Sequence, residues 1–302
     1  MRMVPLNITL PNGFLDEEVR DGFTVTKQVK ELWAIEIDLL FQLDKICKKY
    51  NLKYFADGGT LLGCIRHNGY IPWDDDIDIC MTRSDYEKLC EIAPTELEYP
   101  YFFQNERTDP GCVWGHSKLC NSNTTMILDS YKKRNFKFNQ GIFIDIFPQD
   151  NVPDDEIEQK KFFEKLQKLK KASKVFRGRS HVDFGEKNIL KILYSRVVNF
   201  LGIKNFSYFK FEKLCQKYNG QKCKYCASIS FKPERRIGFK PTSSLEKTSN
   251  RKFEFFELPC PDNYEWILSD YFGDWHTPIK GASMHGSVFI DTDKSYKEYI
   301  LR

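Results

Sequence analysis

Four aspartates occupy positions 74, 75, 76 and 78 of the segment IPWDDDIDIC (71–80). Like charges this close repel one another, by about 4 kcal/mol for a pair about 4 Å apart at an effective dielectric of about 20. Pro72 disfavours a helix, and the alternation Asp76-Ile-Asp78-Ile is typical of a half-buried strand. On a strand Asp76 and Asp78 share one face, about 7 Å apart at Cα, so both carboxylates can reach one cation. Hard oxygen ligands and phosphate suit Mg²⁺ or Mn²⁺, so the spacing predicts a metal-dependent phosphate site.

Three other interpretations of the aspartate run are weaker. An EF-hand loop that begins at Asp74 needs glycine at position 79 and glutamate at position 85, where this chain has Ile79 and Asp85. The DDxxD pattern of terpene cyclases needs a helix, which Pro72 disfavours. A solvated surface run would not alternate with apolar residues such as Ile77. The metal interpretation is therefore favoured.

Two further features bear on the same site. Asp145 lies inside the apolar segment GIFIDIFPQD (141–150), which predicts a strand. A buried carboxylate is seldom left unpaired, so Asp145 either accepts from a buried arginine or backbone amides, or joins Asp76 and Asp78 from a neighbouring strand. The turn Gly58-Gly59-Thr60 allows positive φ and a close approach of the backbone to a ligand.

The elements that position these residues form an α+β pattern with a small mixed sheet early in the chain and helices late. Apolar residues at three- and four-residue spacing predict a helix over 25–49. We expect the other elements as follows: strands at 53–56, 76–79 and 141–150, helices at 60–67 (with Thr60 as N-cap), 84–92, 154–179, 187–217 and 264–275 (ending near Gly273), and irregular, basic chain at 219–260.

Composition limits the class of protein. The 302 residues are 41% hydrophobic and 29% charged, as in an ordinary globular protein with a full core. A net charge of +4 does not imply nucleic-acid binding. The region 160–179 holds nine basic residues and one acidic residue, which predicts either the solvated side of a helix or a patch for an anionic acceptor or membrane.

Targeting signals and cysteines add little. No segment has the length of a signal peptide or a membrane span, so we expect a cytoplasmic protein. The apolar segment 189–203 is either a buried helix or a peripheral contact with the inner face of the membrane. Cys215, Cys223 and Cys226 include one CxxC and leave a zinc site open, although reduced core cysteines are the simpler interpretation.

Taken together, the motifs resemble those of the LicD family. They are DGGTLLGCIRHNGYIPWDDDIDI (57–79), GIFIDIFPQD (141–150) and YFGDW (271–275). The resemblance implies a nucleotidyltransferase-like fold of the polymerase β superfamily, with surrounding helices and a helical C-terminal region. The corresponding division is an N-terminal extension (1–24), a catalytic core (25–152) and a mainly helical region (153–302).

The resemblance also implies the activity. LicD-like proteins transfer phosphocholine from CDP-choline to sugars of lipopolysaccharide, teichoic acid or capsule, and the related fukutin and fukutin-related protein transfer ribitol phosphate from CDP-ribitol. By position, Gly58, Gly59 and Thr60 match the turn beside the nucleotide phosphates. Asp76 and Asp78 match the metal-binding pair, and Asp145 matches the third carboxylate. The resemblance assigns nothing to Asp74 and Asp75; Asp75 either pairs with Arg66 or extends the metal cluster.

The mechanism that these matches suggest is in-line attack by an acceptor hydroxyl on the β-phosphorus of a CDP-linked donor, with release of CMP. Asp145 would complete the metal site or take the acceptor proton. Arg66 and Lys118 are candidates for phosphate oxygens. Trp275 either stacks on a base or choline cation or packs in the core. His67, His116, His276 and His285 are interpreted as ordinary core or surface residues.

Three alternatives stay open at this point. The transferred group could be ribitol, glycerol or ethanolamine phosphate in place of phosphocholine. An Asp-x-Asp pair also binds nucleotide sugars in glycosyltransferases. A metal-binding scaffold without activity is the third, although all three carboxylates are present. The expected partners are a CDP-linked donor and a glycan or lipid-linked glycan, with no nucleic acid.

Overall fold

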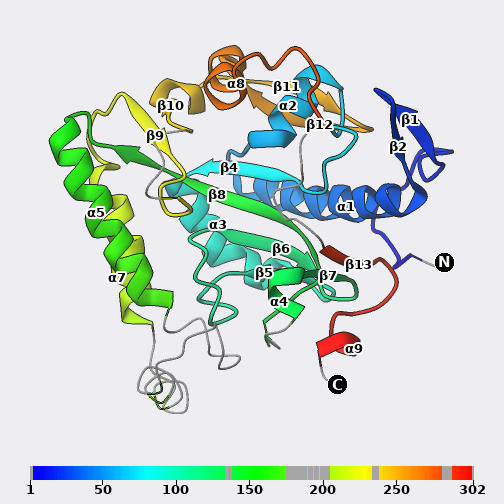
Figure 1. Cartoon of the computed structure of the whole chain (residues 1–302), viewed down its shortest axis with the longest axis horizontal. Coiled ribbons are helices and arrows are strands. Elements are labelled where there is room, and N and C mark those ends of the chain that lie inside the picture. Colours follow the sequence, from blue (N-terminus) through cyan, green and yellow to red (C-terminus); the bar gives the residue numbers. More distant parts are fainter. Residues whose placement is uncertain are drawn as a thin grey trace.

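The centre of the fold is the long strand β8 (Ile142–Val152), which is buried along almost its whole length. The computed structural model describes residues 3–132, 136, 138–174, 189, 193, 197, 205–232, 238–280 and 288–300. Nearly every side chain of β8 is buried, as expected for a continuous apolar run with β-branched residues. Strands join β8 along both of its edges (Figure 1).

The main sheet is mixed. β4 pairs with β8 in parallel, and β3 pairs with β4 in antiparallel. Along its other edge β8 pairs first with β6 and then with β9, both in antiparallel. β5 extends the β6 branch and β10 extends the β9 branch. The bounds of these strands are β3 (Phe55–Ala56), β4 (Asp78–Thr82), β5 (Tyr101–Gln104), β6 (Ser117–Asn121), β9 (Tyr225–Ala227) and β10 (Lys240–Pro241).

Three two-stranded sheets stand beside the main sheet, and each is antiparallel. They are β1 (Glu18–Arg20) with β2 (Phe23–Val25), β11 (Thr248–Phe253) with β12 (Phe256–Pro261), and β7 (Thr125–Leu128) with β13 (Val288–Asp291). The helices of the described chain are α1 (Lys27–Tyr50), α2 (Gly58–Arg66), α3 (Arg83–Glu96), α4 (Asp129–Lys132), α5 (Glu156–Ser173), α7 (Phe206–Cys215), α8 (Tyr264–Phe272) and α9 (Lys297–Ile300), with 3-10 turns η2 (Gln216–Tyr218) and η3 (Thr242–Leu245).

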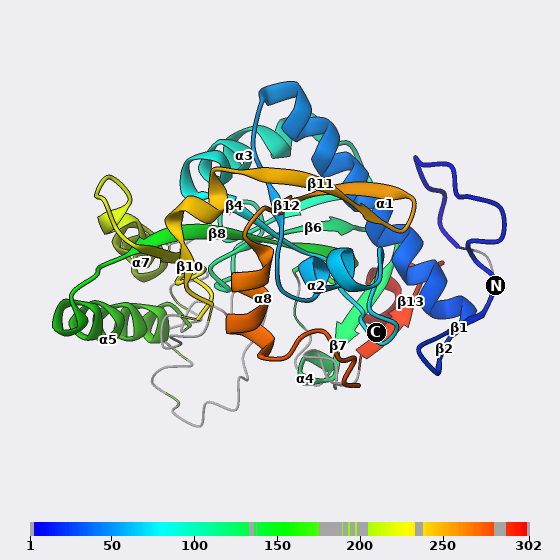
Figure 2. The same ribbon diagram turned by 90° about the horizontal axis from the view of Figure 1, so that it is seen from above.

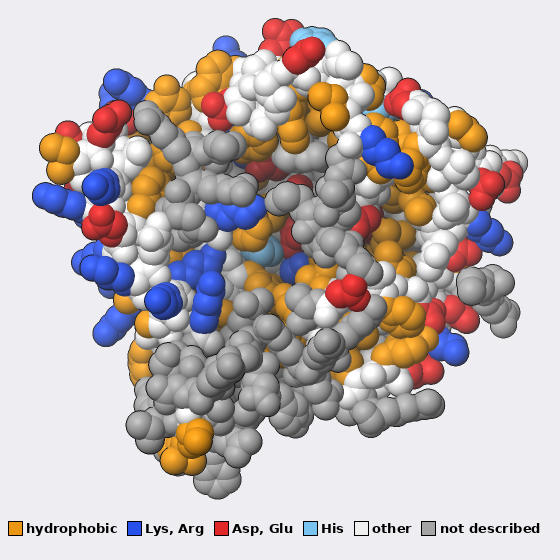
Figure 3. All heavy atoms as spheres, viewed as in Figure 1, with side chains coloured by type: hydrophobic (Ala, Val, Ile, Leu, Met, Phe, Trp, Pro, Cys, Tyr) orange, Lys and Arg blue, Asp and Glu red, His pale blue; other side chains and the backbone are white. Residues whose placement is uncertain are grey.

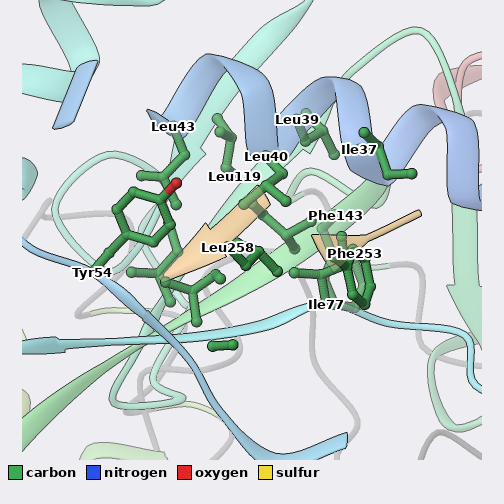
Figure 4. Packing of buried hydrophobic residues seen from close by; sticks show 14 of the residues in the cluster. Ile37, Leu39, Leu40, Leu43, Tyr54, Ile77, Leu119, Phe143, Phe253 and Leu258 are labelled. Carbon is green, nitrogen blue, oxygen red and sulfur yellow. The ribbon is translucent and has the colours of Figure 1, made fainter. Parts of the chain in front are cut away.

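The longest helix, α1, packs against the sheet and forms the main core with it. Thr26 caps its N-terminus by accepting a hydrogen bond from the amide of Val29, and Asn51 ends it in the left-handed conformation. Figure 4 shows Leu40 and Leu43 of α1 in one cluster with Leu119 of β6, and also with Phe143 and Leu258. Burying such side chains contributes about 1.5–3 kcal/mol each, so this cluster fixes α1 against β6 and β8.

Two other groups of elements complete the fold. α2, α8 and the β11–β12 hairpin lie together beside β3, at the top of Figure 1. α5 and α7 pack against each other next to β9 and bury a second cluster that includes Phe162, Leu166 and Phe211. Figure 2 shows both groups from above, with α8 and α2 nearest the viewer. Lysine and arginine side chains gather over α5 and α7 in Figure 3, so the described part of the basic run is an exposed helix face.

Much of the predicted pattern is confirmed. The α+β class, the mixed sheet, the early helix, the strand at 141–150, the helix at 84–92 and the late helix that ends at Gly273 are all present. The division into regions 1–24, 25–152 and 153–302 stays a prediction. No helix in the described residues is both long and apolar enough to cross a bilayer.

Three predictions of secondary structure are wrong. The region 219–260 is not irregular, because it contributes β9 and β10 to the main sheet and the hairpin β11–β12. The strand of the aspartate segment begins at Asp78, so Asp76 precedes it. The helix at 58–66 is capped by Asp57, not by Thr60.

Some predictions fall on residues outside the described chain. They include His285, residues 175–179 of the basic run and most of the helix expected at 187–217. Of the segment 189–203, the structure describes Ile189, Leu193 and Val197, which are helical and exposed.

Candidate active site

The candidate site begins where β3 turns into α2. Asp57 adopts an extended conformation and its side-chain Oδ1 accepts a hydrogen bond from the amide of Gly58 (2.9 Å), which starts the helix. Gly58 has φ +51°, a conformation that favours glycine. Asp57 therefore takes the N-cap role that the sequence assigned to Thr60.

The two glycines make room for carboxylates. A Cβ atom on Gly58 would lie 2.8 Å from Oδ2 of Asp78, and one on Gly59 would lie 2.6 Å from Oδ2 of Asp74. Both distances are shorter than real Cβ contacts, so side chains at these positions would push the carboxylates away. The groups that approach the turn in this structure are the protein's own aspartates, and the approach of the turn to a ligand stays a prediction.

Thr60 has a different role from the predicted cap. Its hydroxyl accepts a hydrogen bond from the backbone amide of Asp78 (2.8 Å). The backbone carbonyl of Asp78 accepts from the amide of Asp57 (3.0 Å). The first turn of α2 thus holds both backbone groups of Asp78, which fixes where its carboxylate lies.

The aspartate loop (Asp74–Asp76) contacts α1. Trp33 donates its indole N–H to the backbone carbonyl of Asp74 (3.1 Å) and stacks on Tyr70, with ring centroids 4.4 Å apart. Asp74, Asp75 and Asp76 each offer a carboxylate oxygen, and these oxygens lie within 4.8 Å of one another. Among the described residues, this is the group of histidine, cysteine, aspartate or glutamate side chains that meets closely enough for one metal ion.

Asp145 lies next to Asp78, as predicted. The two are register partners across the parallel pair β4–β8, and Lys118 is the partner of Asp145 on β6. Oδ1 of Asp145 is 3.3 Å from Nζ of Lys118 and 3.0 Å from Nε2 of His116, and all three residues are buried. Asp145 thus has basic partners on its β6 side and the aspartate loop on its β4 side.

Burial and the neighbouring negative charges shift the pKa values of the aspartates. Burial raises the pKa of Asp78 well above its usual range, and the charges of Asp76 and Asp145 raise it further. Burial followed by the charges of Asp76 and Asp75 does the same to the pKa of Asp74. A cation bound among them would favour the ionised forms, because it offsets both effects. Burial lowers the pKa of His116, against the opposing effect of Asp145.

A pocket of about 290 Å³ opens beside the loop. Its described lining combines carboxylates with apolar and aromatic side chains: Gly59, Leu62, Arg66, Ile71, Trp73, Asp74, Asp76, Asp78, Phe272, Asp274, Trp275, Thr277 and Ile279. The motif at 271–275 therefore lies against the motif at 57–79, as a shared site requires. On the face shown in Figure 3, acidic, basic and histidine side chains also lie in a central hollow.

Arg66 and Trp275 meet at this pocket. Nη1 of Arg66 donates to the backbone carbonyl of Trp275 (2.7 Å). The indole of Trp275 is largely buried in the main core and stacks on His276 (centroids 3.9 Å apart). The structure thus places Arg66 and Trp275 with the aspartates, and whether they bind a ligand stays a prediction.

The other candidates are not brought to the site as ligands. Cys215, Cys223 and Cys226 are free thiols, and among the described residues they do not form a group that could hold a metal. Nε2 of His67 lies 2.9 Å from Oδ2 of Asp21, and Nδ1 of His67 lies 3.4 Å from Nε of Arg66. Sequence reasoning missed the contact of His116 with Asp145 and an ion pair between Asp57 and Lys240, whose Nζ lies 2.6 Å from Oδ2 of Asp57. A lysine 183 residues away carries no local signal for this pairing.

Glu36 of α1 lies beneath the loop and generates a testable prediction. Burial raises the pKa of this carboxyl well above its usual value of 4.5, and the nearby aspartates raise it further, although the hydroxyl of Tyr70 donates to it (2.8 Å). The folded protein therefore keeps a proton that the unfolded chain releases above about pH 4.5, so ionisation costs stability as the pH rises. Glu36→Gln keeps an acceptor for Tyr70 and cannot ionise.

We expect Glu36→Gln to be more stable than the wild type, by a margin that grows between pH 5 and pH 8. Urea unfolding at several pH values measures the free energy of unfolding of both proteins. The exposed Glu91→Gln on α3 is the matched control, with a margin that should stay small and flat. A margin for Glu36→Gln that does not change with pH would contradict the assignment.

Comparison with known proteins supports a single family. Residues 51–191 match the family model described as "LicD/FKTN/FKRP, nucleotidyltransferase domain". The chain is 24% identical over 253 residues to "Lipopolysaccharide cholinephosphotransferase LicD" of Haemophilus influenzae, covering 82% of this chain and 91% of that protein. It is 30% identical over 139 residues to an uncharacterized protein of Rickettsia prowazekii, covering 46% of each. The region that matches the family model contains the glycine turn, the aspartate loop and Asp145, so residues 51–191 are similar to the nucleotidyltransferase domain of the LicD family.

Proposed function

We propose that this LicD-like phosphotransferase moves a phospho-alcohol, with phosphocholine as the first choice, from a CDP-linked donor to a hydroxyl of a cell-surface glycan and releases CMP. The similar Haemophilus influenzae protein is named for cholinephosphate transfer and lipopolysaccharide. The observation that carries the proposal is the alignment of Asp78 with Asp145 beside the loop Asp74–Asp76, over the glycine turn of α2.

The donor set fits Mg²⁺ or Mn²⁺. Carboxylate oxygens are hard ligands, and those of Asp74, Asp75 and Asp76 already converge to within 4.8 Å of one another. We propose that Asp76 and Asp78 hold the metal, that Asp145 completes the site, and that Asp74 and Asp75 extend it. A divalent ion bound there would neutralise the diphosphate and stabilise the leaving CMP.

The chain's own residues would bind and orient the reactants. The N-terminus of α2 presents backbone amides of the glycine turn, which suit phosphate oxygens. Arg66 on the pocket wall and Lys118 beside Asp145 supply positive charge for the same oxygens. Phosphoryl transfer has a loose transition state, so such positioning and charge neutralisation provide most of the rate.

Asp145 is our candidate for the group that takes the proton of the acceptor hydroxyl. It is held in place by His116 and Lys118, whose nitrogens lie 3.0 and 3.3 Å from its Oδ1. A carboxylate that also coordinates a metal ion is a weak base. Positioning of the hydroxyl is therefore the larger part of the role that we propose for Asp145.

The pocket lining supports phosphocholine over a polyol phosphate. Trp73, Phe272 and Trp275 contribute aromatic surface, and Asp274 adds a carboxylate. A quaternary ammonium group makes no conventional hydrogen bonds and is attracted by aromatic faces and negative charge. Ribitol or glycerol would instead need several hydroxyl partners, whereas much of the described lining is apolar.

The acceptor side is less defined. The exposed lysines of α5 form a basic face that would suit an anionic glycan or lipid-linked glycan. Peripheral contact with a membrane stays a proposal, supported by the exposure of Ile189, Leu193 and Val197.

A donor panel tests the proposed function. Purified protein with Mg²⁺ and total lipopolysaccharide or wall glycan is incubated with CDP-choline, CDP-ethanolamine, CDP-glycerol, CDP-ribitol and UDP-sugars, and released nucleotide is quantified. We expect CMP from CDP-choline, no release after EDTA, and recovery with Mg²⁺ or Mn²⁺. Asp78→Asn should lose at least about 100-fold in turnover, since it removes charge at the reacting phosphate. Release of UDP alone would point to a glycosyltransferase, and near-normal turnover of Asp78→Asn would overturn the metal assignment.

Gly59→Ala tests the close packing of the turn. Its Cβ would lie 2.6 Å from Oδ2 of Asp74, so the loop must move. We expect CMP release to fall by at least about tenfold, as for small misplacements of reacting groups, while the melting temperature changes by only a few degrees. Gly220→Ala, where a Cβ meets nothing within 4 Å, is the control. Full activity of Gly59→Ala would show that the loop position does not matter.

A further inference from the structure

A buried lysine contacts the turn of the candidate site from far along the chain. Lys240 lies on β10, outside residues 51–191 that match the family model. Its Nζ donates to Oδ2 of Asp57 (2.6 Å) and lies 3.7 Å from Sγ of Cys80. Only 1% of the lysine is exposed. Lysine is almost never fully buried unless it is paired, so the contact with Asp57 is what allows Lys240 to be buried here.

The pair is an ion pair and not a neutral contact. Burial acts to lower the pKa of Lys240, but the charge and hydrogen bond of Asp57, together with Cys80 and Tyr271, outweigh it and raise that pKa well above its usual range. The lysine therefore stays protonated.

Asp57 links this lysine to the candidate catalytic residues. One oxygen of Asp57 caps α2 through the amide of Gly58, and the other accepts from Lys240. The backbone amide of Asp57 donates to the carbonyl of Asp78. A movement of Asp57 would thus displace the glycine turn and Asp78 together.

The same lysine also lies near α8, which borders the pocket. Its Nζ lies 5.7 Å from the ring centroid of Tyr271 on α8. The residues that follow Tyr271, including Phe272, Asp274 and Trp275, line the pocket. Lys240 therefore lies between α2, which carries the glycine turn, and α8, whose last residue Phe272 lines the pocket.

Charge gives a second reason for the pairing. Asp57 is one more carboxylate near Asp78, because its backbone amide donates to the carbonyl of Asp78 (3.0 Å). With Lys240 beside it, Asp57 serves as a helix cap and its charge is compensated. Without Lys240, Asp57 would either lose its position or add repulsion to the loop.

We propose that Lys240 is a positioning residue for the transfer reaction, which acts through Asp57 to hold the glycine turn and Asp78 in place. The inference rests on the proposed function for its kinetic consequence, but its structural consequence can be measured without any substrate.

The experiment compares Lys240→Met with Arg83→Met. Arg83 is also buried and donates to a buried aspartate, Asp150, but that pair joins α3 to the far end of β8 and does not contact α2. Both variants lose the cation of a buried ion pair, so both should lose stability. The difference between them isolates the effect on the site.

Two readouts are measured on the full chain: amide hydrogen exchange over residues 57–66, and kcat and KM for CMP release from CDP-choline. We expect Lys240→Met to increase exchange at 57–66 and to reduce kcat by about 10- to 100-fold. This is the range typical of residues that orient site residues without touching the substrate, about 10- to 100-fold. KM should change by less than about threefold. Arg83→Met should leave exchange at 57–66 and kcat close to the wild type when both are measured well below its melting temperature.

Lys240→Arg, which keeps a buried cation for Asp57, should recover most of the lost protection. Asp57→Asn keeps one oxygen for the cap but turns an amide NH2, which cannot accept a hydrogen bond, toward Lys240, and it should show both changes. It carries the test if Lys240→Met does not fold.

The proposal is overturned if exchange at 57–66 is unchanged in Lys240→Met, or if exchange increases while kcat stays at the wild-type value. Equal effects in Arg83→Met and Lys240→Met would show that Lys240 contributes only to general stability, which would also overturn the proposal. If the wild type releases no CMP from any CDP-linked donor, the proposed function has failed, and exchange at 57–66 alone decides whether Lys240 holds the turn.

Discussion

The rest of the site depends on how this fold holds several carboxylates together against their mutual repulsion. Asp74, Asp75 and Asp76 converge, Asp78 follows them, and Asp145 is the register partner of Asp78 on the next strand. Each close pair of like charges raises the free energy of the folded state, so the fold keeps such a pair only where other contacts outweigh this cost. Here those contacts come from the backbone of the first turn of α2 and from a few buried basic side chains.

The geometry follows from that constraint. Thr60 and Asp57 hold the amide and carbonyl of Asp78, and two glycines leave space for the carboxylates of Asp74 and Asp78. Among the described residues, Lys240 pairs with Asp57, and Lys118 and His116 lie beside Asp145. Asp74, Asp76 and Asp78 line a pocket, and their hard oxygen ligands would suit the divalent cation that we propose.

The sequence alone predicted the features that depend on local pattern. The periodicity of α1 and the apolar run of β8 are strong signals, and a lone aspartate within that run predicted the neighbour of Asp78 correctly. Asp57 and Thr60 are both good N-cap residues three positions apart, so local preference could not choose between them. The short strands β9 and β10 form by pairing with partners distant in the sequence. They lie in a basic, turn-rich segment whose local pattern does not predict strands. Lys240 and His116 were missed because their carboxylate partners come from other parts of the chain.

The most direct test of the account is to locate the metal. Crystals grown with Mn²⁺ and CMP can be examined by anomalous diffraction at the manganese edge. The account predicts an anomalous peak bonded to carboxylate oxygens of the aspartate loop, with Asp76 and Asp78 among the ligands and a phosphate oxygen of CMP beside it. Well-ordered CMP with no manganese near these aspartates, or manganese bound only elsewhere, would contradict it.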